Sequence, residues 1–420
     1  MTMMPRVVFF IAMRQLWDRK LLNGIAVLGV MLGVLTLISI NGIMQGFQQK
    51  FLNNIIKISP HVTVFDKQLR PSPGILARFS GDFVAARVSH ETPSDRQLRI
   101  NRPAEIVRAI ERMEGVIGAA GGLTGSAVLA FGSKLYPVDL RGIDPPRQDK
   151  VTPIAQYVIQ GNYRSLDASQ GSILLGSGVA TRIGAKVGDI VNCGSALGAP
   201  IGLKVVGIYE AGIPPVDNTR VYVHVRTAQS LLGKPDIIGR IDIKLADPDG
   251  SARFSGRLEQ MLGYDAESWQ EANQNFLALF KQQNTIIGFV VGAILAVGGF
   301  GILAIQIMIV LQKTRDIAIL RSVGFRRRDI LTAFLLQGAI IATVGAVVGD
   351  FGGHWVLVAL SRLKTKQEGL VKSEFFLVFD DPQMYIWGAL FALVVGIVAS
   401  LIPAIRGSRV EPVDVLRGQI

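Results

Sequence analysis

The residues that could do chemistry in this 420-residue chain do not form a catalytic constellation. The sequence contains no phosphate-binding loop of the form G-x-x-x-x-G-K-[ST], and it contains neither the G-x-S-x-G motif of hydrolases nor the H-E-x-x-H motif of metalloproteases. The histidines do not have the spacing of metal ligands; they are His61, His90, His224 and His354. The sequence therefore predicts a non-catalytic protein without a cofactor or metal of its own.

One ionisable pair, Asp350 and His354, lies one helical turn apart inside an apolar stretch. Ionisable groups within a membrane span are candidates for a functional role. Counted from Ile330 at roughly 1.5 Å per residue, however, Asp350 lies about 30 Å along the helix, near the far edge of a hydrocarbon core. An interfacial position is therefore the favoured interpretation, and contact with a substrate or a proton is the alternative.

The segment "KTRDIAILRSVGFRRRDI", Lys313 to Ile330, has six basic and two acidic side chains and lies between two of the most apolar runs in the chain. Ile317, Leu320 and Gly324 recur at a spacing of three to four, which gives a helix one apolar edge surrounded by charges. An apolar edge with a charged rim is typical of a protein interface. The alternative is plain anchoring by cytoplasmic arginines, which explains the charges but not the edge.

The elements that carry these residues are membrane helices. The chain is 49% apolar with a mean hydropathy of +0.38, and its apolar residues are concentrated in four stretches. Each is near or above the roughly 20 residues that a spanning helix needs; they cover 21–44, 285–311, 330–360 and 384–405. Glycines at a spacing of four in the third stretch are typical of close helix packing; they are Gly345, Gly349 and Gly353.

The basic residues beside the spans predict the orientation. They cluster in the N-terminal segment, in 313–328 and after the fourth span, so both termini and the 313–329 segment are expected on the cytoplasmic side. The first apolar run reads as an uncleaved anchor rather than a signal peptide. A short amphipathic segment precedes it, and a simple extension of the first helix is the alternative reading of that segment. The net charge of +12 follows largely from these residues, and no nucleic-acid partner is expected.

Two amphipathic patterns extend beyond the spans. An apolar seam from Leu37 to Ile58 continues past the first span and ends before Pro60, and a second pattern from Trp269 to Gln283 leads into the second span. These patterns predict a helical stalk beneath an external domain; the alternative is that each helix packs on that domain. The domain reads as α+β, and its 69–101 interval reads as an exposed excursion or a docking surface.

The expected fold is thus a four-helix membrane protein with a large α+β extracytoplasmic domain between helices 1 and 2. The expected segments are 1–20 (amphipathic N-terminus), 21–60 (first span and stalk), 61–267 (extracytoplasmic domain), 268–312 (stalk and second span), 313–329 (cytoplasmic helix), 330–360 (third span), 361–383 (extracytoplasmic loop), 384–405 (fourth span) and 406–420 (cytoplasmic tail).

The sequence also resembles a known family. Lys313 to Ile330 resembles the cytoplasmic segment after the second span of MacB/FtsX-like permeases of ABC transporters, with "LR", a small residue, a glycine and basic residues before isoleucine. "GVLTLISINGIMQGFQQKFLNNIIKISPHVTV" is similar to the first span and stalk of the lipoprotein-releasing permeases. So are "LRGIDP" (140–145), "SWQEANQNFLALF" (268–280) and "PAIRGSRVEPVDVLR" (403–417). The resemblance covers nearly the whole chain in order and topology.

The resemblance implies a multi-pass permease of the bacterial inner membrane that is driven by a separate ABC ATPase dimer, which binds the ATP and Mg. In the family, the segment between spans two and three is a coupling helix in a groove of the ATPase. Carried over to this sequence, the contacting residues are Arg315, Asp316, Ile317, Leu320, Arg321, Gly324, Arg326, Arg327 and Arg328.

The implied mechanism is mechanotransmission, in which closure of the ATPase dimer moves the stalks of two permeases, either two copies of this chain or this chain and a paralogue. A lipoprotein or another lipid-linked substrate would enter from the outer leaflet between the first spans and be lifted to a periplasmic carrier. Acyl chains need an apolar wall, and the expected wall is Ile40, Met44, Phe47, Phe280 and Ile287.

Two other functions are implied by the wider family. One is MacB-like efflux with a membrane-fusion protein, and the other is FtsX-like signalling that activates a cell-wall hydrolase. Lipoprotein-releasing permeases that recruit the carrier do so through a protruding hook loop. The corresponding hairpin here, Asn192 to Val206, is short, which argues against direct recruitment of the carrier by this chain.

Overall fold

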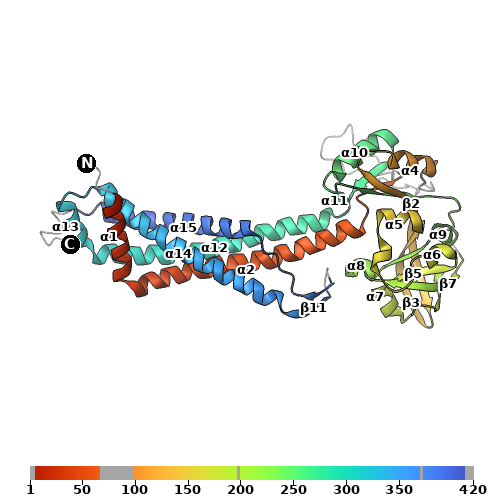
Figure 1. Ribbon diagram of the computed structural model, residues 1–420, viewed down its shortest axis with the longest axis horizontal. Helices are drawn as coiled ribbons and strands as arrows, with labels where there is room; N and C mark the ends of the chain where they lie inside the picture. The colour runs from red at the N-terminus through yellow and green to blue at the C-terminus, as the bar shows by residue number, and fades with distance from the viewer. Residues whose placement is uncertain (1–4, 67–98, 196–198, 369–371, 412–420) are drawn as a thin grey trace, which may run out of the picture. The chain divides into compact units, whose positions relative to one another are not determined.

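The computed structural model describes residues 5–66, 99–195, 199–368 and 372–411, and most of the 69–101 interval lies outside these ranges. Among these described residues, four helices are long and apolar enough to cross a membrane (Figure 1). They are α2 (Lys20–Ile58), α12 (Gln274–Gln312), α14 (Arg327–Ser361) and α15 (Pro382–Ser408). Each contains one of the predicted spans, so the prediction of four membrane helices is confirmed.

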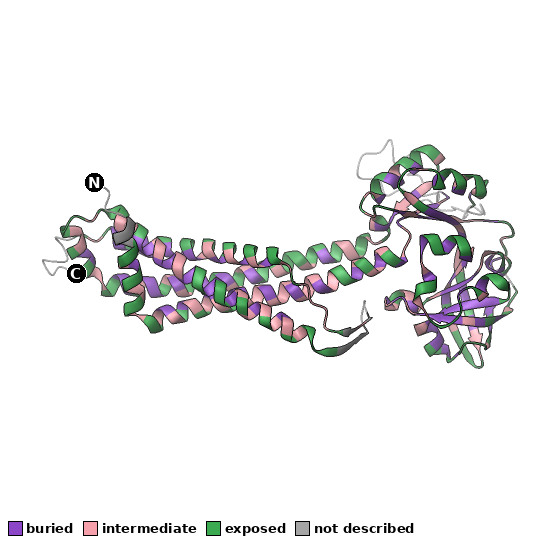
Figure 2. Ribbon diagram, viewed as in Figure 1, coloured by how far each residue is buried: buried purple, intermediate pink, exposed green. Residues whose placement is uncertain are grey.

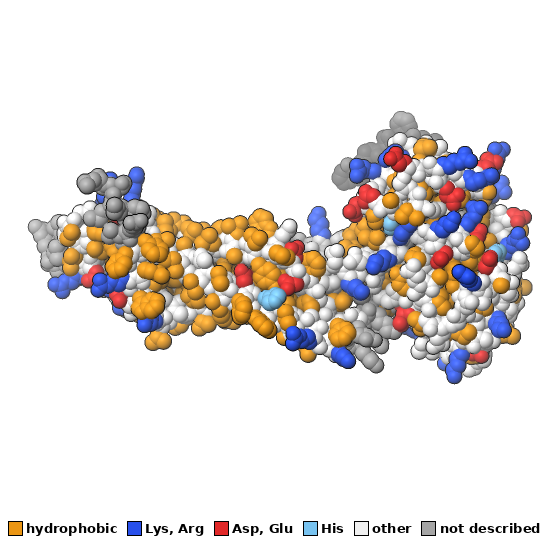
Figure 3. All heavy atoms as spheres, viewed as in Figure 1, with side chains coloured by type: hydrophobic (Ala, Val, Ile, Leu, Met, Phe, Trp, Pro, Cys, Tyr) orange, Lys and Arg blue, Asp and Glu red, His pale blue; other side chains and the backbone are white. Residues whose placement is uncertain are grey.

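The chain divides into two units. The first comprises residues 1–50, 278–367 and 373–420 and holds the four spans; the second comprises residues 51–277 and 368–372 and holds the soluble domain. Apolar side chains cover the long helices, whereas lysines and arginines gather at the end of the bundle where both termini lie (Figure 3). This is the pattern expected of a bundle surrounded by lipid.

The N-terminal helix α1 (Pro5–Asp18) is separate from α2 and packs on α14. The turn between α1 and α2 is held by the Asn23 side-chain amide, which donates to the Leu16 carbonyl over 2.8 Å. Gln337 of α14 hydrogen-bonds Gln15 of α1. Apolar side chains remain exposed along α1, as an interfacial helix requires; they are Phe9, Phe10, Met13 and Trp17.

Small residues set the helix contacts inside the bundle. A β-carbon on Gly345 or Gly349 would come within 2.7 or 2.8 Å of α2 atoms, and one on Gly353 within 2.9 Å of Ile38. The packing role predicted for this glycine stripe is therefore confirmed. The buried residues form a continuous seam between the four helices (Figure 2).

The soluble domain is α+β, as predicted. Ten strands of the described residues form one mixed sheet in the order β10-β1-β9-β2-β3-β8-β5-β7-β4, with β6 pairing with β2 and β7. The strands are β1 (Val62–Phe65), β2 (Val116–Phe131), β3 (Lys134–Ile143), β4 (Val158–Gly161), β5 (Ser172–Gly176), β6 (Ile190–Gly194), β7 (Ile201–Tyr209), β8 (Arg220–His224), β9 (Arg240–Leu245) and β10 (Asp265–Ser268). The hairpin β11 (Lys364–Glu368) and β12 (Lys372–Phe375) joins the third and fourth spans.

The long strand β2 belongs to both halves of the domain. Its first part pairs with β9 and its second part with β3 and β6. One core lies among β1, β9, β10, α4 (Pro103–Glu111) and α10 (Ser251–Leu262), and the other lies among β3, β5, β6, β7, β8, α7 (Ser177–Ile183) and α9 (Val225–Leu231). Four further short helices lie in the described part of the domain, α5 (Pro145–Val151), α6 (Ser165–Ala168), α8 (Pro214–Asp217) and α11 (Trp269–Ala272).

The carboxyl end of α2 is held by polar groups of the domain. Lys244 Nζ donates to the carbonyl oxygens of Ile56 (2.7 Å) and Ser59 (3.3 Å), and His61 Nε2 lies 3.2 Å from the Ile56 oxygen. A cation beside unsatisfied carbonyl groups is favourable at this end of a helix. Burial and the neighbouring Lys244 lower the pKa of His61 to about 4.

The buried His61 is expected to make the domain less stable in acid. Its folded-state pKa lies below its ordinary value, so the unfolded chain takes up a proton first as the pH falls from about 6.5 to 4, and stability is lost over that window. We expect the difference in unfolding free energy between the wild type and His61→Gln to shift by about 3 kcal/mol between pH 7 and pH 4. Denaturation of the full chain at both pH values measures it, and a constant difference would contradict the expectation.

Candidate functional site

A lateral cavity of about 540 Å³ opens between α2, α12 and α15. Leu37 lies about 25 Å along α2 from Lys20 at roughly 1.5 Å per residue, so the cavity is at the end of the bundle away from the two termini. Its wall is apolar with a few amides, and it comprises Leu37, Asn41, Gln45, Asn284, Ile287, Gly288, Val291, Asp381, Gln383, Met384, Trp387, Gly388 and Phe391.

The amides form a polar strip in this apolar wall. Gln45 Nε2 donates to Asn41 Oδ1 over 3.1 Å, and near them Gln48 Nε2 donates to Asn284 Oδ1 over 3.0 Å, joining α2 to α12. Polar groups near the membrane interface can satisfy one another while the surrounding surface stays apolar. The cavity therefore offers an apolar chain a wall and offers a polar head group a few hydrogen-bonding partners.

Of the five residues predicted to line a cavity, Ile287 lines this one. Phe47 and Phe280 instead pack edge to face on each other with ring centroids 6.2 Å apart, and Ile40 and Met44 are half-buried on α2 outside the lining. The predicted wall, which belongs to an entry between the first spans of two permeases, stays a prediction; in the cavity of the single chain, α15 supplies much of the lining. Periodicity could not identify Trp387 or Phe391, since it does not say which helices are neighbours.

The helices α2 and α12 also meet beyond their spans. Within the second unit, Phe51 and Phe276 pack with ring centroids 5.1 Å apart. The pattern before the second span is interrupted, however, because α11 ends at Ala272 and α12 begins at Gln274. Trp269 is held in the domain by its indole nitrogen, which donates to the Pro248 carbonyl over 2.9 Å.

The Asp350 and His354 pair lies in a polar cluster at the outer end of the bundle. His354 Nδ1 is 3.1 Å from Asp380 Oδ2 and 3.2 Å from the Tyr385 hydroxyl, which donates to Asp380 Oδ1 over 2.7 Å. Asp350 Oδ1 is buried and has no hydrogen-bond partner among the described residues. The cluster ties α14 to the start of α15.

At the opposite end of the bundle, the charged segment folds as helix α13 (Thr314–Ser322). Lys313 Nζ holds its start between Asp316 (3.3 Å) and Asp18 of α1 (3.6 Å). Gly324 ends the turn with a φ of +109°, a conformation that side chains other than glycine rarely adopt. The Asp329 carboxylate then accepts from the Arg326 backbone N–H over 2.9 Å and caps α14.

The structure corrects the expected binding face of this segment. Ile317 is buried in the bundle and Leu320 packs against its core, so these two side chains stabilise the permease itself. The exposed apolar side chains are Ile319 and Val323, which lie one turn apart. Helical spacing gives two apolar edges here, and only the position of the bundle decides which one is free.

The arginines of the segment also divide into two groups. Arg321 donates to the Val410 carbonyl and Arg327 lies 3.4 Å from the Glu411 carboxylate, so both hold the segment that follows α15. The other charged residues of the set are exposed; they are Arg315, Asp316, Arg326 and Arg328. The outward surface of α13 thus combines two apolar side chains with a charged surround.

Comparison with known families identifies the chain. The model of the MacB-like periplasmic core domain matches residues 24–261, more than half of the chain, and that of the FtsX-like permease C-terminal region matches residues 288–412. The chain belongs to the MacB/FtsX-like permease family. The resemblance found in the sequence is thereby confirmed, and the periplasmic placement of the domain between α2 and α12 with it.

Three relatives of this permease cover nearly all of it. The lipoprotein-releasing system transmembrane protein LolC of Xylella fastidiosa (strain 9a5c) is 28% identical over 93% of this chain and 92% of its own. LolE of Haemophilus influenzae is 24% identical over 93% and 92%. The macrolide export ATP-binding/permease protein MacB of Agrobacterium fabrum is 23% identical over 96% of this chain and 59% of its own. With four apolar helices, the permease is a multi-pass protein of the inner-membrane type.

The hairpin compared with a hook loop in the sequence is formed by β6 and β7. β6 ends at Gly194 and β7 begins at Ile201, so only residues 195–200 join the two strands. Residues 196–198 lie outside the described ranges. The short connection agrees with the sequence argument, and the expectation that this hairpin does not recruit a carrier stays a prediction.

Proposed function

We propose that this permease is the membrane subunit of an ABC transporter of the lipoprotein-releasing type, driven by a separate ATPase. The substrate is a lipoprotein or another lipid-linked molecule in the outer leaflet. Both termini lie in the cytoplasm, and the working unit pairs this chain with a second permease. The observation that carries the proposal is the lateral apolar cavity at the outer end of the bundle, supported by the similarity to lipoprotein-releasing permeases over most of the chain.

The geometry of the cavity fits a lipid-anchored substrate. An acyl chain gains about 25 cal/mol per Å² of apolar surface removed from water, but it gains little by moving from lipid into an equally apolar wall. Substrate selection therefore falls to the polar strip of Asn41, Gln45 and Asn284, which can bind the polar linkage next to the acyl chains.

The energy for release comes from the cytoplasmic side. The outward face of α13, with Ile319 and Val323 inside a charged surround, binds the partner ATPase. Because Ile317 and Ala318 anchor α13 in the bundle, a movement of α13 displaces the adjoining helices rather than a loose loop. The permease contributes no step of ATP hydrolysis in this proposal; it transmits the movement to the outer end of the bundle.

Site-specific photocrosslinking tests the substrate. Benzoylphenylalanine placed at Ile287 is expected to crosslink a lipoprotein in cells severalfold more efficiently than the same group at Phe289, which is on the same helix and 79% exposed. The physical reason is that Ile287 lines the cavity while the Phe289 side chain faces outward. Mass spectrometry of the crosslinked species gives the identity of the bound molecule.

The outcomes separate the candidate functions. Lipoprotein crosslinks at Ile287 support lipoprotein release. A crosslink to a membrane-fusion protein, without one to a lipoprotein, would favour efflux. A crosslink to a cell-wall hydrolase would favour signalling. Equal crosslinking of bulk lipid at both positions would contradict the assignment of this cavity to a substrate.

A further inference from the structure

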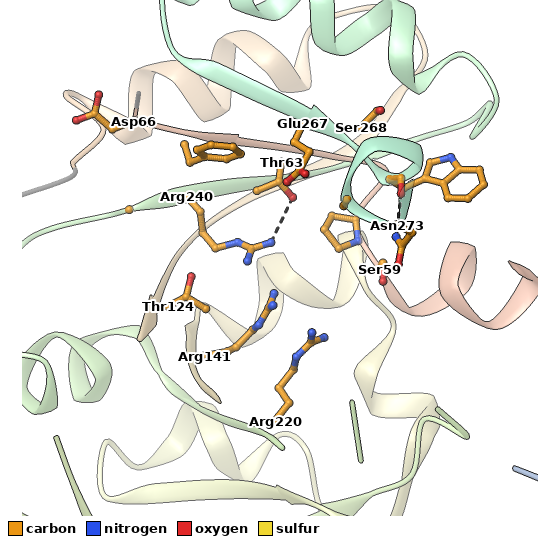
Figure 4. Close-up of a pocket in the computed structure, with 15 residues that line it drawn as sticks. Ser59, Thr63, Asp66, Thr124, Arg141, Arg220, Arg240, Glu267, Ser268 and Asn273 are labelled. Atoms are coloured by element: carbon orange, nitrogen blue, oxygen red, sulfur yellow. Dashed lines mark hydrogen bonds between the residues drawn. The ribbon is translucent and has the colours of Figure 1, made fainter. Parts of the chain in front are cut away.

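The soluble domain contains a second cavity, of about 460 Å³, that the transport proposal does not use. Arginines from three strands point into it, Arg141 from β3, Arg220 from β8 and Arg240 from β9 (Figure 4). Each of the three side chains is less than one-fifth exposed. Arginines are seldom placed together in a partly buried cavity unless acidic groups or a ligand compensate them.

The protein compensates one of the three guanidinium groups fully. Arg240 Nε and Nη2 both contact Asp242 Oδ1, at 2.8 and 2.5 Å, and Nη2 also donates to the Thr63 hydroxyl over 3.2 Å. This arginine is therefore fixed by its own strand and by β1. It forms a wall of the cavity without offering much uncompensated charge.

The other two guanidinium groups share a single carboxylate. Arg141 Nε is 3.4 Å and Arg220 Nε is 3.6 Å from the same oxygen of Asp139. Arg220 Nε has no hydrogen-bond partner among the described residues, although the Arg220 side chain also interacts with Tyr222 of the same strand, which favours its charged form. Burial and the two neighbouring arginines lower the pKa of Arg141 to about 10 against the opposing effect of Asp139. Two cations facing one anion leave positive charge at this end of the cavity.

The remaining wall is mixed, with polar groups, two acidic groups and the apolar side chains of Pro60, Phe65, Trp269 and Ala272. Hydroxyls and one amide line it; they belong to Ser59, Thr63, Thr124, Ser268 and Asn273. Glu267 and Asp66 lie on the side formed by β1 and β10, away from Arg141 and Arg220 (Figure 4). Burial and Glu271 raise the pKa of Glu267. Positive charge thus gathers at one end, and hydrogen-bond acceptors suited to hydroxyl groups gather at the other.

We propose that this cavity binds a phosphate ester, with the phosphate group on Arg141 and Arg220 and a hydroxyl-bearing body toward Glu267 and Asp66. Guanidinium groups bind phosphate oxygens through paired charge-assisted hydrogen bonds. A cavity of about 460 Å³ exceeds the space that a bare phosphate needs and matches the range of small-molecule sites. The phosphate ester is either a free solute or the head group of a lipid.

The position of the cavity gives the bound ester access to the helix ends. Ser59 and Pro60 follow α2 directly, and Asn273 stands between α11 and α12. A ligand held by Arg141 and Arg220 would therefore contact segments that continue into the first and second membrane helices.

Isothermal titration calorimetry of the full chain in a phosphate-free detergent tests the proposal. The soluble probes are inorganic phosphate and glycerol 3-phosphate. The lipid probe is phosphatidylglycerol, and diacylglycerol, which lacks the phosphate group, is its control. We expect saturable binding that Arg141→Gln and Arg220→Gln each weaken about tenfold or more, because each variant removes charge-assisted hydrogen bonds. In either single variant, one arginine remains to form an ion pair with Asp139, so the carboxylate stays compensated and the domain is expected to fold.

Two further variants keep the test decisive. Arg147→Gln removes a half-exposed arginine of the same domain, 3.7 Å from Asp144, and is expected to leave binding unchanged. Glu267→Gln removes a negative charge from the wall and is expected to tighten binding of inorganic phosphate, a gain that misfolding cannot produce.

Binding of phosphatidylglycerol alone assigns the ester to a lipid head group, and binding of glycerol 3-phosphate assigns it to a solute. Absence of saturable binding by all phosphate probes, or equal binding by the Arg141→Gln and Arg220→Gln variants, would overturn the site.

Discussion

Val323→Glu is expected to detach the permease from its ATPase while leaving it inserted and folded. Val323 is 70% exposed at the end of α13, and Ile319, one turn earlier, is 47% exposed. A charge placed in the apolar centre of an interface costs about 2 kcal/mol or more, which is a factor of about 30 in affinity. We expect the double variant Ile319→Glu with Val323→Glu to abolish the association.

Copurification of the ATPase with the tagged permease measures this effect. Gln312→Glu adds the same charge at an exposed position just before α13 without removing an apolar contact, and it is expected to retain the ATPase. Gly324 is a poorer target, because its φ of +109° would strain any side chain and confuse a folding defect with a binding defect. Normal ATPase recovery with the double variant would refute the assigned face of α13.

Gly338→Ala is expected to destabilise the membrane bundle. Gly338 of α14 faces Ser400 of α15, and an added β-carbon would overlap the Ser400 side chain and lie 2.9 Å from the Gly396 carbonyl oxygen. Gly396 in turn faces Ala342, so the two helices cannot separate locally without losing both contacts. Overpacking of this kind costs about 1–3 kcal/mol, and Gly338→Leu is expected to prevent accumulation of folded protein.

Gly301→Ala is the matched control for this prediction. Gly301 lies in the span of α12, and nothing lies within 4 Å of an added β-carbon. Alanine is a better helix former than glycine by about 1 kcal/mol, so this variant is expected to be neutral or stabilising. Thermal unfolding in detergent compares the pair, and a Gly338→Ala protein that melts at or above the wild-type temperature would disprove the proposed close contact.

The sequence predicted the features that depend on local pattern. A long apolar run must be helical in a membrane, because every backbone polar group then needs a partner within its own segment. The four spans, the glycine stripe of Gly345, Gly349 and Gly353, and the α+β domain all followed from composition and periodicity. The family resemblance rested on short motifs that keep their order along the chain, and the two family models confirm it.

The sequence did not predict contacts between distant segments. The apolar edge of Ile317 and Leu320 was assigned to a partner, yet it packs on the bundle, because a single helix does not show which of its faces a neighbouring helix covers. Of the predicted wall residues, Ile287 lines the cavity between α2, α12 and α15, and the contribution of α15 to that cavity was not predicted.

What the sequence by itself determined is the number of spans, the class of the soluble domain and the family. What only the tertiary structure decided is the outward face of α13, the contribution of Trp387 and Phe391 to the lateral cavity, and the meeting of Arg141, Arg220 and Arg240 in one domain cavity. The physical reason is that hydrophobic periodicity records whether a side chain is buried, whereas the identity of its neighbours depends on how separate helices and strands pack.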